Sequence, residues 1–109
     1  MRHYLIERQI PGVGSLSADQ YQVLAATSNR AIAKLAGKAQ WMESYIAADN
    51  TFCVYFAEDE GVLREHSRLA GFPITRVNEI LTVIDPLTAY RPLFGGPETR
   101  LLAGSGADA

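Results

Sequence analysis

The chain has 109 residues, of which 48% are hydrophobic and 20% charged, and its formal net charge is −2. This length suits a single domain, and this composition is that of an ordinary folded protein rather than a disordered one. Because Lys and Arg do not outnumber Asp and Glu, the positive excess that attracts nucleic-acid phosphates is missing. We therefore expect no nucleic-acid partner.

Cysteine content and apolar runs narrow the class of protein further. Cys53 is the only cysteine, which excludes an intramolecular disulfide and a structural zinc site that needs two or more cysteine ligands. The first residues become charged too early for a signal-peptide core, and no apolar run approaches the roughly 18–20 residues that cross a bilayer. We expect a cytoplasmic protein with no membrane partner.

A strand and a helix are predicted at the start of the chain. Residues 4–10 read as a strand that enters the glycine-rich segment 11–14. This segment lacks the lysine and hydroxyl of a phosphate-binding loop, so a plain turn is the better interpretation. Ser17 and Gln20 have the spacing of a capping box, and apolar residues then recur every three or four positions. A helix is expected over residues 18–36.

A β-hairpin is predicted next. Residues 40–46 and 51–57 are rich in aromatic and β-branched side chains, and only a short turn separates them. Such a connection favours two antiparallel neighbours. We expect both faces of the first of these strands to be at least partly covered.

A second helix and a last strand complete the pattern. The acidic residues 58–60 suit the positive end of a helix, and Gly71 followed by Pro73 marks its end. A strand is then expected over residues 77–84, before Asp-Pro. Residues 90–109 have a different composition, with many glycines, and are expected to be a largely flexible extension of a domain that spans residues 1–89.

The order strand, helix, strand, strand, helix, strand predicts an α+β fold of the ferredoxin-like βαββαβ type. This fold has a four-stranded antiparallel sheet with two helices on one face. Residues 52–56 are apolar at both sets of alternating positions, so the other face would leave an apolar patch in a monomer. We therefore expect a homodimer joined through that face, as in dimeric α/β barrels.

His66 is the most informative polar residue, because it falls at the centre of the apolar stripe of the second helix. One interpretation is a metal ligand or a general base in a pocket between helix and sheet. The other is a structural histidine that bonds a core carboxylate, a tyrosine or a backbone carbonyl.

The remaining candidates are one thiol and several carboxylates. Cys53 is interpreted either as a packed hydrophobe or as a soft metal ligand. Glu7, Glu43 and Glu79 fall within predicted strands, where they either line a cavity with Arg8 or His66 or form ion pairs at a subunit contact. The acidic run at 58–60, together with Glu65, is interpreted as a solvated helix end or as oxygen ligands for a divalent cation.

Several short motifs resemble a bacterial family of small nickel-binding proteins, formerly described only as a domain of unknown function. The motifs are Cys-Val-Tyr at 53–55, Arg-Glu-His at 64–66, Gly-Phe-Pro at 71–73 and Val-Ile-Asp-Pro at 83–86. The resemblance covers roughly residues 3–89. It implies a ferredoxin-like fold, dimerisation and nickel binding, and it points to His66 with Glu65 as the first metal ligands and Cys53 with Glu58 as the next.

Three hypotheses follow. The first is a homodimeric protein that binds nickel or a similar divalent metal through His66 and nearby donors, for sequestration rather than catalysis. The second is an enzyme of the dimeric α/β-barrel type, which acts on a small apolar molecule with His66 as acid or base and Glu7 or Glu43 assisting. That hypothesis predicts a pocket of about 300 Å³ or more with His66 on its wall. The third is an interaction module whose only ligand is its own copy.

Overall fold

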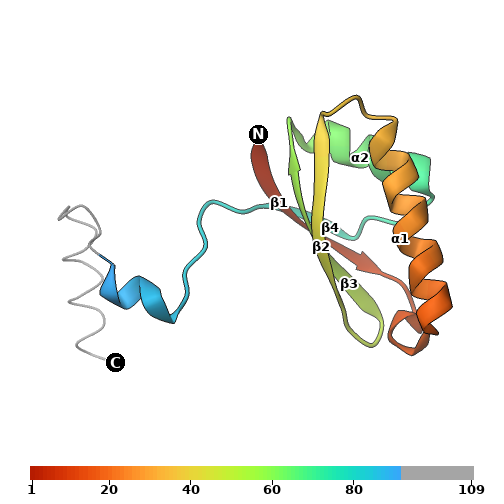
Figure 1. Cartoon of the computed structure of the whole chain (residues 1–109), viewed down its shortest axis with the longest axis horizontal. Coiled ribbons are helices and arrows are strands. Elements are labelled where there is room, and N and C mark those ends of the chain that lie inside the picture. The colour runs from red at the N-terminus through yellow and green to blue at the C-terminus, as the bar shows by residue number, and fades with distance from the viewer. Residues whose placement is uncertain (92–109) are drawn as a thin grey trace.

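One antiparallel sheet and two helices make up the described part of the protein, which is residues 1–91 of a computed structural model (Figure 1). The strands are β1 (Arg2–Gln9), β2 (Ala39–Ile46), β3 (Asn50–Ala57) and β4 (Arg76–Glu79); the helices are α1 (Ala18–Ala33) and α2 (Glu60–Ala70); and short 3-10 turns lie at η1 (Val13–Ser15) and η2 (Pro86–Tyr90).

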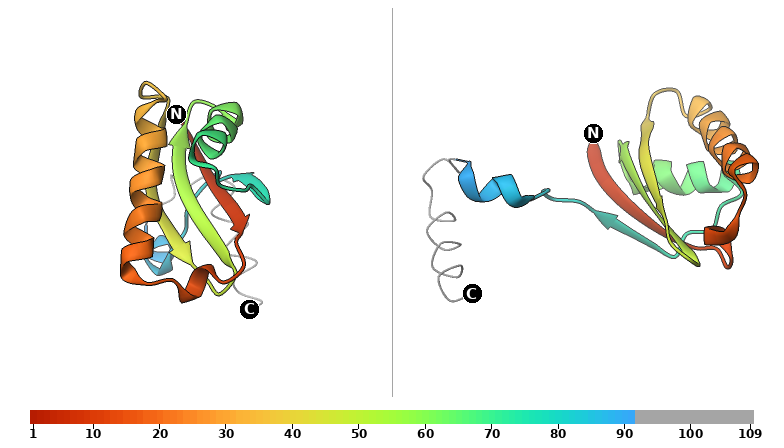
Figure 2. Two further views of the ribbon diagram at one scale, coloured as in Figure 1. Left: turned by 90° about the vertical axis from the view of Figure 1, so that its right-hand side faces the viewer. Right: turned by 60° about the horizontal axis from the view of Figure 1, so that its bottom comes forward.

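The strand order is β2-β3-β1-β4, and every pairing is antiparallel. Both helices lie against the same face of the sheet, and the described residues leave the opposite face uncovered (Figures 1 and 2). This confirms the predicted α+β, ferredoxin-like arrangement. Of the predicted extension at 90–109, all but the first two residues lie outside the described part.

The helix ends follow from local side-chain chemistry. At the start of α1 the Ser17 side chain accepts from the backbone N–H of Gln20, and the Gln20 side chain accepts from the backbone N–H of Ser17, so the predicted capping box is confirmed. The helix ends at Ala33, three residues before the predicted end, and Ala36 and Gly37 then adopt left-handed conformations. Within residues 1–91, no helix is both long and apolar enough to span a membrane.

The sheet has two chemically different faces because successive side chains of a strand point to opposite sides. On the helix side, Tyr4, Ile6, Cys53 and Tyr55 are buried and form the core together with Leu63 of α2. We call the other side the open face. It carries five large apolar side chains near its middle and polar ones around them. The apolar group is Leu5, Tyr45, Phe52, Val54 and Phe56.

Strand β2 is an edge strand, and its side chains on the open face are more exposed than predicted. A register shift between Trp41 and Glu43 marks a β-bulge, which gives the strand one extra residue and changes its local twist. Met42 at the bulge and Tyr45 on the open face are both substantially exposed. The prediction that both faces of this strand are partly covered is therefore wrong for a single copy.

The last strand is shorter than the predicted 77–84. Its pairing with β1 stops after the backbone N–H of Ile80 donates to the carbonyl of His3 at 2.7 Å. Since β1 itself begins at Arg2, the following residues find no further strand to pair with. Residues 80–91, which we call the C-terminal arm, leave the domain on the side away from the helices (Figures 1 and 2).

The turn between β1 and α1 is fixed by a close backbone approach. A Cβ atom on Gly14 would lie 2.5 Å from the Ala47 carbonyl oxygen and 2.8 Å from Ala48 Cα. The backbone N–H of Gly14 also donates to the Ala48 carbonyl at 2.9 Å. This position therefore requires glycine for packing against the β2–β3 hairpin.

Replacement of Gly14 with alanine should lower the free energy of unfolding by about 1–3 kcal/mol, the usual cost of overpacking. Urea unfolding followed by circular dichroism measures this change. Ser15→Ala, at the exposed neighbouring position, is the control and should change the free energy by less than about 0.5 kcal/mol. Equal stability of the two variants would contradict the packing argument.

Candidate functional site

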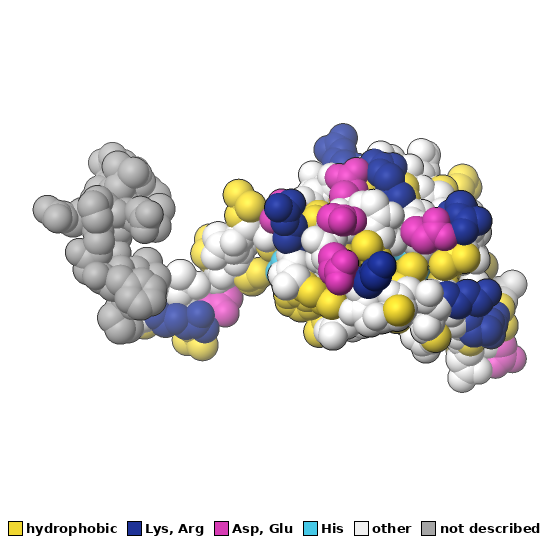
Figure 3. Space-filling model, turned by 90° about the horizontal axis from the view of Figure 1, so that it is seen from above, with side chains coloured by type: hydrophobic (Ala, Val, Ile, Leu, Met, Phe, Trp, Pro, Cys, Tyr) yellow, Lys and Arg dark blue, Asp and Glu magenta, His cyan; other side chains and the backbone are white. Residues whose placement is uncertain are grey.

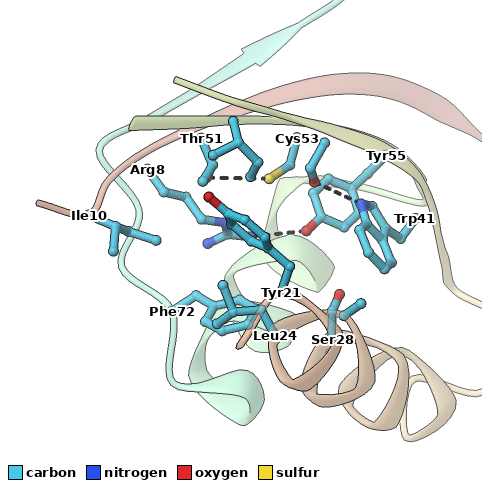
Figure 4. Close-up of a pocket in the computed structure, with 13 residues that line it drawn as sticks. Arg8, Ile10, Tyr21, Leu24, Ser28, Trp41, Thr51, Cys53, Tyr55 and Phe72 are labelled. Atoms are coloured by element: carbon cyan, nitrogen blue, oxygen red, sulfur yellow. Dashed lines mark hydrogen bonds between the residues drawn. The ribbon is translucent and has the colours of Figure 1, made fainter. Parts of the chain in front are cut away.

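A cavity of about 240 Å³ lies between α1 and the helix-side face of the sheet. Aromatic and aliphatic side chains dominate its wall, and Figure 4 shows them converging from the sheet above and from α1 below. The sheet contributes Arg8, Trp41, Ser44, Thr51, Cys53 and Tyr55; α1 contributes Tyr21, Leu24, Ala25 and Ser28; and Phe72 closes one side.

The polar centre of this wall is Arg8, whose side chain is only 1% exposed. One terminal nitrogen, Nη1, donates to Ser67 Oγ at 2.7 Å and to the Pro73 carbonyl at 2.8 Å. The other, Nη2, donates to the Tyr55 hydroxyl at 3.3 Å. The guanidinium also lies 5.5 Å from the centre of the Phe72 ring, within cation–π range. All these partners are uncharged.

The other polar atoms of the wall make few hydrogen bonds. Trp41 Nε1 donates to Ser44 Oγ at 2.9 Å, which leaves the Ser44 hydroxyl proton available for another acceptor. The Cys53 thiol donates to Thr51 Oγ1 at 3.6 Å, a long sulfur contact. Burial raises the pKa of the Tyr55 hydroxyl, and the nearby Arg8 charge partly offsets this effect. The cavity thus combines an apolar body with a small number of donors.

His66 lies next to this cavity but not on its wall. It is 0% exposed, and its Nε2 is 3.2 Å from Ser28 Oγ, while Nδ1 has no hydrogen-bond partner among the described residues. Burial and the Arg8 charge lower the pKa of this imidazole to about 4. The ring is therefore neutral at physiological pH. Its hydrogen bond is to a serine, a partner that the structural interpretation did not include.

The four predicted metal ligands do not meet in one copy of the protein. His66 and Cys53 are buried on the helix side of the sheet, whereas Glu58 is exposed where β3 meets α2. Glu65 points toward solvent and pairs with Arg68, which lowers the pKa of its carboxyl group. Consecutive residues of a helix point about 100° apart, so Glu65 and His66 face different directions.

The exposed side of α2 carries both charges, because Glu60 pairs with Arg64 and Glu65 pairs with Arg68. Figure 3 shows acidic and basic side chains interspersed over the face that it presents. Across residues 1–91, no group of three or more His, Cys, Asp and Glu side chains is arranged to hold a metal ion.

The enzyme hypothesis predicts a pocket of about 300 Å³ or more with His66 on its wall. The cavity of about 240 Å³ is close to that size, but His66 is not on its wall. Glu7 and Glu43 cannot assist His66, because both belong to the open face: Glu7 accepts from Asn50 Nδ2 at 3.0 Å, and Glu43 accepts from the Tyr45 hydroxyl. Neither shares a face with Arg8 or His66.

Sequence reasoning underrated Arg8. The signal was present in the alternation of the first strand, because Tyr4, Ile6 and Arg8 occupy positions of the same parity and are all buried. Reading this period-two pattern through to Arg8 would have placed a positive charge beneath the helices. For Ser67 no such signal existed, because a serine in a helix does not indicate which side of the helix is buried.

Comparison with known proteins gives two matches. The profile of the family described as "Nickel responsive protein SCO4226-like" matches residues 4–80. The crystal structure of SCO4226 from Streptomyces coelicolor A3(2) superposes with a TM-score of 0.61 at 15% sequence identity, covering 75% of this chain and 99% of that one. At this identity the structural likeness establishes the fold alone. No match is found among curated proteins.

Burial of the neutral His66 ring predicts a stability that falls as the pH is lowered. The unfolded chain binds a proton near the ordinary pKa of 6.5, whereas the folded chain binds it only near pH 4. Acid therefore favours unfolding throughout this interval, to a total of about 3 kcal/mol. Unfolding free energies between pH 7 and 5 measure the effect without much interference from carboxylates.

The matched variants are His66→Gln and His3→Gln. We expect the first to flatten the pH dependence above pH 5 and the second to retain it. Titration of the His66 ring by NMR should find it neutral down to about pH 4. A protonated ring at pH 6 in the folded protein would show the argument to be wrong.

Proposed function

The chain belongs to the family of nickel responsive proteins that resemble SCO4226, and on this premise we propose that it is a homodimeric protein that binds nickel or a similar divalent ion. The observation that carries the proposal is the family match over residues 4–80. We further propose that binding serves to sequester excess metal in the cytoplasm.

At the level of residues, His66 is the first proposed donor and Cys53 the second. The neutral ring of His66 needs no deprotonation before it binds a metal, and Nδ1 is free of protein partners among the described residues. Imidazole suits nickel, and thiolate suits soft metals. Both side chains are on the helix side of the sheet: Cys53 is two positions before Tyr55 on β3, and the His66 ring packs against Tyr55 with ring centres 5.2 Å apart.

Completion of this ligand set requires a change from the single-copy structure. Glu58 and Glu65 point to solvent, and Glu65 would have to leave Arg68 before it could turn inward. We propose that metal loading moves the first turns of α2, so that these two carboxylates approach the buried donors.

A rival ligand set lies on the open face. His3 stacks on Phe56 there, with ring centres 4.4 Å apart, and Glu7 and Glu43 occupy the same face. A second copy docked on this face would bring two sets of these donors toward one another. In this alternative the protein still binds a metal ion, but through residues of the open face instead of His66 and Cys53.

Dimerisation is proposed from the open face and from the C-terminal arm. An apolar centre that contains three aromatic rings, surrounded by polar groups, is the usual composition of a protein interface. The arm adds further exposed apolar side chains on the same side of the sheet, including Leu81 at 88% exposure. The radius of gyration is 17.5 Å, whereas a compact chain of 100 residues has about 13 Å. The difference is consistent with an arm that extends away from the domain. A second copy would cover both surfaces at once.

Chelator-treated wild-type protein should release heat on titration with Ni²⁺ beyond the heat of dilution. His66→Ala should weaken this binding by at least about tenfold, since even the loss of an outer-shell partner has an effect of that size. Isothermal titration calorimetry on full-length protein makes the measurement, and circular dichroism checks that each variant is folded. Should His66→Ala fail to fold, Cys53→Ser tests the same site.

His3→Ala is the matched control for this titration. If only this variant loses the heat, the metal site lies on the open face and His66 is not a ligand. If wild-type protein gives no heat with Ni²⁺, the metal-binding proposal is wrong.

The full chain should have in solution a mass twice that of one copy. Val54→Lys should yield a monomer, because Val54 lies on β3, with β1 on one side and β2 on the other, in the middle of the open face. Val23→Lys is the control, since Val23 is an equally apolar, exposed residue on α1. Light scattering after size exclusion measures the mass. A monomeric wild-type protein, or a dimeric Val54→Lys variant, would contradict an interface on this face.

A further inference from the structure

Arg8 carries a buried positive charge that no carboxylate in residues 1–91 neutralises. Four other arginines of the described chain pair with carboxylates at the surface; these are Arg2, Arg64, Arg68 and Arg91. Arg8 bonds only to two hydroxyl groups and one backbone carbonyl. A guanidinium does not lose its proton in a protein, so this charge is permanent. Buried charges without an anion are costly and rare in folded proteins.

The donors of Arg8 are only partly used. A guanidinium has five N–H donors, and the bonds to Ser67, Pro73 and Tyr55 occupy three of them. Nε is buried and has no hydrogen-bond partner in the described chain. Spare donors on a permanent cation favour an anion over a neutral ligand.

The guanidinium lies at the wall of the cavity between the sheet and α1. Figure 4 shows the Arg8 head group directed toward the Tyr55 hydroxyl, on the side of the sheet that faces α1. The volume of about 240 Å³ exceeds the roughly 150 Å³ of an engineered apolar cavity that binds benzene. Four aromatic side chains line it, and they are Tyr21, Trp41, Tyr55 and Phe72. Such a wall suits a flat or short apolar body.

We propose that this cavity binds a small apolar carboxylate, with Arg8 recognising the carboxyl group and the aromatic wall enclosing the rest of the molecule. The site needs no metal ion, although Cys53 on its wall is also a proposed nickel donor. One guanidinium balances one negative charge, and the described residues place no second cation on the wall. A monoanion is therefore favoured over a phosphate dianion. Ser44 lies on the same wall with a free hydroxyl proton, which gives the ligand a second donor.

Calorimetry with phenylacetate as the probe tests the proposal, with phenylacetamide as its neutral counterpart. The full-length protein is treated with chelator, so that nickel plays no part. We expect phenylacetate to bind at least about tenfold more tightly than the amide, because a hydrogen bond to a charged group contributes more than one to a neutral group. Equal affinity of the two probes, or no binding of phenylacetate, would overturn the proposal.

Arg8→Met should remove the preference for phenylacetate over the amide. The variant replaces a buried charge with an apolar side chain, so its melting temperature without ligand should stay near or above that of wild type. Unchanged phenylacetate affinity in this variant would exclude Arg8 as the anion-binding residue. If Arg8→Met does not fold, Arg8→Lys retains the charge and is expected to retain the preference for the carboxylate.

A pair of variants on α1 locates the ligand without touching Arg8. Ala25 lines the cavity, whereas Ala26 next to it faces solvent. Ala25→Phe should fill the space and weaken phenylacetate binding at least tenfold, while Ala26→Phe should leave it unchanged. Equal effects of the two substitutions would place the ligand elsewhere. Loss of Ni²⁺ binding in the separate titration would leave all these outcomes unaffected.

Discussion

The structure depends on one strand that is apolar on both of its faces. On the helix side, β3 supplies Cys53 and Tyr55 to the core and to the cavity wall. On the open face it supplies Phe52, Val54 and Phe56. A strand of this kind is ordinarily buried between two layers, and here the helices form only one of them. The position of the cavity and the apolar character of the open face both follow from this constraint.

Burial on the helix side also explains the electrostatics of the site. Arg8 and His66 are both removed from water, and the permanent charge of the first helps to keep the second neutral. Ser28 and Ser67 supply the hydrogen bonds that make this burial tolerable. The interior therefore contains one cation and one neutral ring, which is a different arrangement from the acid–base pair that the enzyme hypothesis required.

The order of strands and helices could be predicted from the sequence, because each element carries a local signal. Ser17 and Gln20 mark the start of α1, and Gly71 marks the end of α2 with its left-handed backbone. The length of β4 could not be predicted, since it depends on where β1 begins in the folded sheet. The apolar residues beyond Ile80 continue the strand pattern, although the described part of the chain gives them no neighbouring strand.

The candidate site was less accessible to sequence reasoning than the fold. The helical period correctly placed His66 on the buried side of α2, but its serine partner lies on the other helix, 38 positions earlier in the chain. The cavity itself has no sequence signature, because its wall is assembled from six separate elements or loops. The hypothesis that Glu7 or Glu43 assists His66 arose because the sequence pattern did not decide which side of the sheet these two residues face.

The junction between the first turn and the β2–β3 hairpin has a consequence for entry to the interior. The backbone N–H groups of Ile10, Gly12 and Gly14 are bonded to Asp49 and Ala48, so hydrogen bonds join the loop to the hairpin. Ile10 of this loop and the half-exposed Ile46 at the end of β2 line one side of the cavity. The facing side is lined by the first half of α1, whose start is fixed by its capping box. A few side chains of α1 would then determine which sizes of molecule enter the cavity. Substitutions at those positions could change this preference without any change in the sheet.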